Sequence, residues 1–130
     1  MIGQIMLAAA AATSFNLTCT GEVLTKLKKE LPSREPRQVD VRVDLRSNKY
    51  CIADCASTIA IKKVTDEEIL FQDNPADSEG QNQRFVWRVN RYTGKSSAYL
   101  KLKDGTDVLE EGFCTRSPFT GFKQMRVRKF

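Results

Sequence analysis

The chain has 130 residues, which is close to the commonest size of a single folded domain. Apolar residues make up 41% of it and charged residues 28%, proportions of an ordinary globular domain that exclude a disordered tail, a collagen or a coiled coil. The sequence contains no histidine, so catalytic systems built on an imidazole base and metal sites with histidine ligands are excluded.

The N-terminal segment has the pattern of an export signal. Residues 1–14 carry no charged side chain, and residues 5–12 are an unbroken apolar stretch followed by small residues. We therefore expect residues 1–14 to be a secretory signal peptide, residues 15–130 to be the mature domain, and the protein to be periplasmic or secreted. The alternative is an alanine-rich first helix of a cytosolic protein. No run approaches the roughly 20 apolar residues of a transmembrane helix.

Four cysteines, Cys19, Cys51, Cys55 and Cys114, are spread over this small chain. Behind a signal peptide, an even number of cysteines indicates disulfides. Four cysteines can form two disulfides in three different pairings. We expect Cys51 to pair with Cys55, because a chain that turns there can bring the two Cα atoms within roughly 4.4–6.8 Å. Cys19 and Cys114 would then close a long loop. A redox or metal pair at Cys51 and Cys55 is disfavoured, since redox motifs use two intervening residues and zinc sites need four ligands.

Alternation of apolar and polar residues predicts most of the strands. In residues 39–45, Val39, Val41, Val43 and Leu45 face a core, whereas Asp40, Arg42 and Asp44 face water. Residues 73–83 are polar and predict a loop. The other expected strands are residues 50–52, 57–64, 68–72, 84–92, 96–103, 108–115 and 121–129.

Residues 22–31 are the one segment that departs from this alternation. Val23, Leu24, Leu27 and Leu31 have helical spacing, which fits either a short amphipathic helix or an irregular strand.

Seven to nine short strands imply an all-β fold, a single antiparallel sheet that curls into a small barrel or a sandwich. The expected interior consists of Val39, Val41, Val43, Ile59, Ile61, Ile69, Phe71, Phe85, Trp87, Leu100 and Leu102.

Four strings of residues give the chain a likeness to a group of proteins. They are FNLTCTG at 15–21, YCIADC at 50–55, VNRYTG at 89–94 and GFCTRSPFTGF at 112–122. Together with the alanine-rich leader, they resemble small exported proteins of alphaproteobacteria, of the sphingomonad type, over nearly the whole mature chain. The resemblance implies export and a disulfide-bonded β fold, and it brings neither an activity nor functional residues.

The positive charge of the chain is concentrated near its C-terminus. The net charge is +5, and residues 115–130 hold five basic residues and no acidic one. Residues 1–114 therefore contain equal numbers of basic and acidic side chains. The five are Arg116, Lys123, Arg126, Arg128 and Lys129. On a strand over residues 121–130, Arg126 and Arg128 would share a face with phenylalanines, an arrangement that suits an anionic headgroup, a sugar acid or a phosphate. The alternative is a solvated edge strand, on which the charged side chains prevent pairing with the edge of another sheet.

These features predict an exported, non-enzymatic binding domain that contacts an anionic envelope component or a protein partner through its basic strand. Nucleic acid is disfavoured as a partner, because no recognised binding motif is present. One alternative is a carrier of a small apolar ligand, with Phe85 and Trp87 as a pocket wall rather than plain core. Another is a thiol–disulfide redox protein that uses Cys51 and Cys55. No catalytic residue, metal ligand or cofactor is expected.

Overall fold

The computed structural model describes residues 13–27, 31–75 and 84–122. Within these ranges the chain forms β-strands and no helix, and so includes no candidate for a membrane-spanning helix. The strands are β1 (Ser14–Lys26), β2 (Ser33–Asp44), β3 (Lys49–Ile52), β4 (Ile59–Ala60), β5 (Lys63–Val64), β6 (Glu68–Asn74), β7 (Arg84–Asn90), β8 (Lys95–Lys101) and β9 (Asp107–Ser117).

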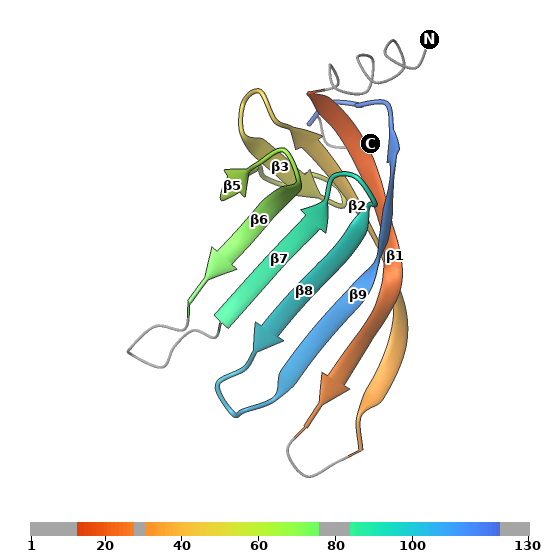
Figure 1. Ribbon diagram of the computed structural model, residues 1–130, viewed down its shortest axis with the longest axis vertical. Helices are drawn as coiled ribbons and strands as arrows, with labels where there is room; N and C mark the ends of the chain where they lie inside the picture. The colour runs from red at the N-terminus through yellow and green to blue at the C-terminus, as the bar shows by residue number, and fades with distance from the viewer. Residues whose placement is uncertain (1–12, 28–30, 76–83, 123–130) are drawn as a thin grey trace, which may run out of the picture.

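All these strands belong to one antiparallel sheet, in the order β4-β3-β2-β1-β9-β8-β7-β6-β5. The first and last strands, β1 and β9, therefore pair at its centre. Figure 1 shows the sheet curving from β6 and β7 through β9 and β1 to β2, which makes it a half-barrel. The all-β fold with a single curled antiparallel sheet is thus confirmed.

The two ends of the sheet are linked through residues 61 and 62. The Ile61 N–H donates to the Asn48 carbonyl before β3 (3.0 Å), and the Lys62 N–H donates to the Phe71 carbonyl of β6 (3.3 Å). The expected single strand at 57–64 is therefore wrong, because the chain passes here from one end of the sheet to the other as β4 and β5. Ile61 is buried, whereas Ile59, which was expected beside it in the interior, is 36% exposed.

Residues 22–26 form strand rather than helix, so the helical alternative for 22–31 is wrong over the part that the structure describes. Val23 lies opposite Glu35 of β2 on one side and Glu110 of β9 on the other. Because both backbone edges of this end of β1 pair with a neighbouring strand, the sheet hydrogen bonds outweigh the local helical spacing.

The core fills the concave side of the sheet near the link between its ends. Tyr50, Phe71 and Trp87 form its centre, with ring centroids 4.3–5.6 Å apart. Of the expected interior, Val41, Val43, Ile61, Ile69, Phe71 and Trp87 are buried, and Val39 and Phe85 are partly buried against them. Leu100 and Leu102 are only half-buried. Phe15, Leu17 and Val89 also belong to the core.

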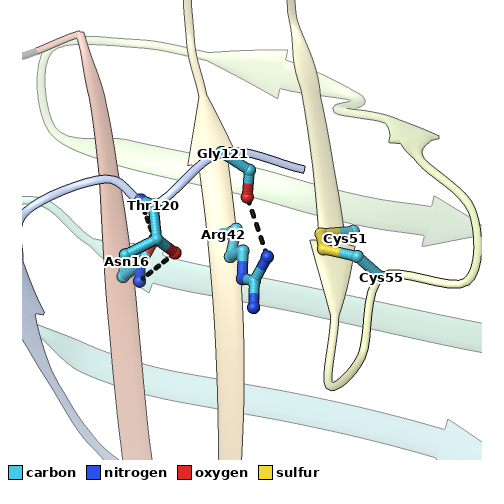
Figure 2. The surroundings of a disulfide bond; sticks show 6 residues. All are labelled: Asn16, Arg42, Cys51, Cys55, Thr120 and Gly121. Atoms are coloured by element: carbon cyan, nitrogen blue, oxygen red, sulfur yellow. Dashed lines mark hydrogen bonds between the residues drawn. A yellow bond between two sulfur atoms is a disulfide. The ribbon is translucent and has the colours of Figure 1, made fainter. Parts of the chain in front are cut away.

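The prediction that Arg42 of β2 faces water is wrong, since only 9% of the residue is exposed. Its guanidinium Nη1 donates to the carbonyl of Gly121 (2.9 Å), and the Asn16 side chain exchanges hydrogen bonds with Thr120 (3.0 and 3.3 Å). Figure 2 shows the segment after β9 crossing β1 and β2 on the convex face, where it covers Arg42. The expected strand at 121–129 is accordingly wrong at its start, because Gly121 and Phe122 lie in this crossing segment.

Several expectations lie outside the described residues. They concern residues 1–12 of the expected signal peptide, residues 76–83 of the expected loop, and the rest of the expected last strand. Ser14, expected to be the last residue of the signal peptide, begins β1. The basic residues Lys123, Arg126, Arg128 and Lys129 are also outside the described ranges.

Both expected disulfides are present. Cys19 of β1 and Cys114 of β9 are directly paired, with Cα atoms 3.9 Å apart, and Cys51 is bonded to Cys55. Gly21 and Gly112 are the next pair on the same face, and a Cβ at either would overlap the opposing backbone. The missing side chains therefore let β1 and β9 approach closely beside their disulfide.

Because disulfides persist in oxidising compartments, two of them indicate a location outside the cytoplasm.

The two disulfides are expected to contribute unequally to stability. Replacing Cys19 and Cys114 by serine should lower the free energy of unfolding by ~4–5 kcal/mol, because the bond closes a sequence separation of 95. Replacing Cys51 and Cys55 by serine should cost ~2 kcal/mol, since their separation is only 4. Urea unfolding followed by circular dichroism measures both losses, and equal losses would contradict the loop-closure explanation.

Candidate functional site

A cavity of about 140 Å³ lies on the concave face of the half-barrel, away from the link between the sheet ends. Phe85 and Trp87, the residues predicted to wall a pocket, both line it. Val39 of β2 and Ile52 of β3 line the side facing them, and Ala98 of β8 lies opposite Trp87 in the β7–β8 pairing. The cavity is therefore mainly apolar and is bounded by both halves of the sheet.

The wall formed by Trp87 is rigid. Its ring stacks on Phe71 with centroids 4.3 Å apart, and its indole Nε1 donates to the Ser96 hydroxyl (3.3 Å). The space in front of it exists because the neighbouring inward-facing positions carry small side chains or none, namely Ala98, Ser96 and Gly112. Large side chains at these positions would fill the concave face, as the aromatic cluster fills it nearer the sheet ends.

Arg37 and Glu110 form the charged part of the cavity lining. Arg37 extends from β2 and Glu110 from β9, and their side chains meet at 3.5 Å across the intervening strand β1. The residue of β1 directly opposite Arg37 is Gly21, which has no side chain to separate Arg37 from Glu110. A partly exposed ion pair of this kind contributes ~0–1 kcal/mol to stability, so its main consequence is a polar border beside an apolar cavity.

Of the five basic residues singled out in the sequence, only Arg116 belongs to the described part of the chain. Its guanidinium carbon lies 5.2 Å from the centre of the Phe15 ring, a cation–π arrangement. Together with Arg91, it lines a second cleft, of about 260 Å³, at the turn between β7 and β8. Within the described ranges the basic residues expected to act as one patch are therefore represented by Arg116 alone.

Cys51 and Cys55 lie apart from both cavities. Cys51 is opposite Arg42 in the β2–β3 pairing, and the two sulfur-bearing residues are 0% and 5% exposed. Exchange with an external thiol requires access to a sulfur atom, so this burial works against a redox role. In the described ranges, no group of three or more cysteine or acidic side chains is placed to hold a metal ion.

Arg37, Glu110 and Arg91 are the site residues that the sequence reasoning missed. Arg37 was detectable, because extending the alternation of residues 39–45 two positions back puts it on the inward face. Glu110 likewise shares a face with Val108 in the predicted strand at 108–115. Arg91 has no such signal, since its place in a cleft depends on how the β7–β8 turn packs against β9.

No protein-family model, curated protein or solved structure matches the chain.

Tyr50 joins the aromatic wall to β6. Its hydroxyl accepts a hydrogen bond from Gln72 Nε2 (2.7 Å). Burial raises the pKa of the Tyr50 phenol above its ordinary value, and the hydrogen bond from Gln72 opposes part of this rise. The folded protein therefore favours the neutral phenol. The resulting stabilisation is complete below about pH 10, the unfolded value, and is lost as the pH rises through the folded pKa.

Tyr50→Phe is expected to cost about 0.5–1.5 kcal/mol at neutral pH, because the hydrogen bond from Gln72 is lost. The variant should also lose less stability than the parent protein between about pH 9 and about pH 12. Denaturant unfolding of both proteins across this range tests the prediction. All other ionisable groups are shared, so the difference between the two profiles isolates Tyr50. Parallel profiles would contradict the assigned cause.

Proposed function

We propose that this protein is an exported, non-enzymatic binding protein, periplasmic or secreted, that holds a small apolar group against Trp87 on the concave face of its half-barrel. Export is supported by the two disulfides and by the resemblance to small exported alphaproteobacterial proteins. A role without catalysis is supported by the absence of histidine and by the burial of both cysteines of the short disulfide.

The observation that carries this proposal is the apolar cavity between Trp87 and the β2–β3 side of the sheet. Its volume of about 140 Å³ is close to that of an apolar cavity able to take up a benzene-sized molecule. A mainly apolar lining with a few placed polar groups is the usual composition of small-molecule sites. Arg37 and Glu110 supply those polar groups here.

Contact with an anionic envelope component through the basic C-terminal segment is part of the same proposal. It is supported by the concentration of positive charge in residues 115–130. Such contact would be electrostatic and therefore sensitive to salt, because the Debye length falls to a few ångströms above about 0.5 M.

The single tryptophan of the chain makes the apolar cavity directly testable. Titration with toluene is expected to change Trp87 fluorescence in a saturable way, since the ring lines the cavity. Ala98→Leu, or the milder Ala98→Val, should abolish or strongly weaken this response by filling the space. Ser97→Leu is the matched control, because Ser97 is the adjacent residue and faces the opposite side of β8.

Circular dichroism and the unfolding midpoint would establish that the variants are folded. No saturable response in the parent protein would contradict the proposed cavity function. An equal response of the Ala98 variants and Ser97→Leu would contradict the assignment to this cavity.

A further inference from the structure

The cleft of about 260 Å³ lies where the start of β1, the end of β9 and the β7–β8 turn meet. It is separate from the Trp87 cavity, and the Cys19–Cys114 disulfide stands between them, since Cys19 lines one and Cys114 the other. Four core residues from both halves of the sheet, each at most 6% exposed, line its base: Phe15, Leu17, Ile69 and Val89.

Arg91 and Arg116 bring two positive charges to this cleft. Arg91 Nη1 donates to the Thr65 carbonyl oxygen (2.6 Å), which holds the side chain in place and leaves its other donors for a ligand. Arg116 is held over the Phe15 ring. Each guanidinium is thus positioned by a neutral group.

The lack of a carboxylate partner sets these two arginines apart. In the described part of the chain, no carboxylate lies within 4.0 Å of Arg91 or Arg116. Four other arginines, Arg34, Arg37, Arg84 and Arg88, each have a carboxylate at 3.3–3.9 Å. The cleft therefore concentrates positive charge that the described carboxylates leave unneutralised.

The β7–β8 turn that carries Arg91 is fixed by its own hydrogen bonds. The side-chain oxygen of Asn90 accepts from the N–H groups of Tyr92 and Thr93 (2.8 and 2.9 Å), and the Gly94 carbonyl accepts from the Cys114 N–H (2.7 Å). Gly94 has a φ of 80°, and a Cβ there would lie 2.5 Å from the Cys114 carbonyl oxygen. The turn is therefore seated directly on β9, so the cleft is formed before any ligand arrives.

We propose that this cleft binds a small organic anion, a carboxylate or a phosphate monoester, of about ten heavy atoms in all. The size follows from the cleft volume, because a cavity of about 150 Å³ accommodates benzene. Guanidinium groups suit this anion, since they bind carboxylate and phosphate oxygens through paired, charge-assisted hydrogen bonds. The inference depends neither on the Trp87 cavity nor on the residues after 122.

Isothermal titration with benzoate and with phenyl phosphate tests this site, and benzamide serves as the neutral analogue of benzoate. We expect saturable binding of the anions and none of benzamide. Arg91→Gln and Arg116→Gln should each weaken anion binding about tenfold or more, which is the effect of losing a hydrogen bond to a charged group. Arg88→Gln is the control of equal charge, because Arg88 lies on β7 and pairs with Glu68 instead.

Amide chemical shifts locate the binding independently of these variants. The expected result is that benzoate shifts the resonances of residues 90–94 and 114–116 and leaves those around Ala98 unchanged. Equal binding of benzamide, equal weakening in Arg88→Gln, or shifts of equal size at residues far from the cleft would overturn the proposal. So would the absence of saturable binding of either anion.

The source of the anion is distinguished by vesicles that contain phosphatidylglycerol. Vesicle binding that Arg91→Gln and Arg116→Gln reduce, and that phenyl phosphate competes away, would identify a lipid headgroup as the source. Binding of the soluble anions without vesicle binding would identify a free small molecule. Toluene binding at Trp87 is measured separately, so failure of that site and failure of this one give different results.

Discussion

The pairing of β1 with β9 is the constraint on which the rest of the structure depends. It joins the first strand of the chain to the last, so the strands β1–β4 on one side and β5–β9 on the other meet at the centre of the sheet. The Cys19–Cys114 disulfide crosses this seam, and the facing glycines Gly21 and Gly112 let the two backbones approach beside it. The concave face then gathers residues of both halves, because the ends of the sheet are also linked through Ile61.

Two hollows remain on this face because its side chains are unevenly sized. Near the link between the sheet ends, Tyr50, Phe71 and Trp87 pack closely and fill the curve. Further along, Ala98 and Gly112 occupy inward positions and leave the Trp87 cavity. At the other side of the disulfide, the β7–β8 turn reaches β9 through its backbone, and a cleft forms between the turn and β1. One cavity is mainly apolar, and the other is lined by buried core side chains and by two arginines.

Alternation in the sequence predicted the fold wherever one strand face packs on the core, as at Val41, Val43 and Trp87. It failed where distant pairing decides the outcome. Val23 and Leu24 have helical spacing, yet β2 and β9 pair with both edges of their strand. The alternation placed Arg42 on the outer face, but the segment that covers this face has no local signature. The wall residues Phe85 and Trp87 were visible in the pattern, whereas the presence of Arg91 and Arg116 in one cleft depends on the contact of Gly94 with Cys114.

The disulfide at the seam also bears on how strongly such cavities could bind. Binding is weakened by the ordering of flexible side chains and loops, and walls that are already fixed avoid most of this loss. Trp87 is held by Phe71 and Ser96, and Arg91 is held by Thr65. Cys19 lines one cavity and Cys114 the other, so this bond links a wall of each. The oxidised state therefore covalently joins the walls of both cavities, in agreement with the location outside the cytoplasm that two disulfides indicate.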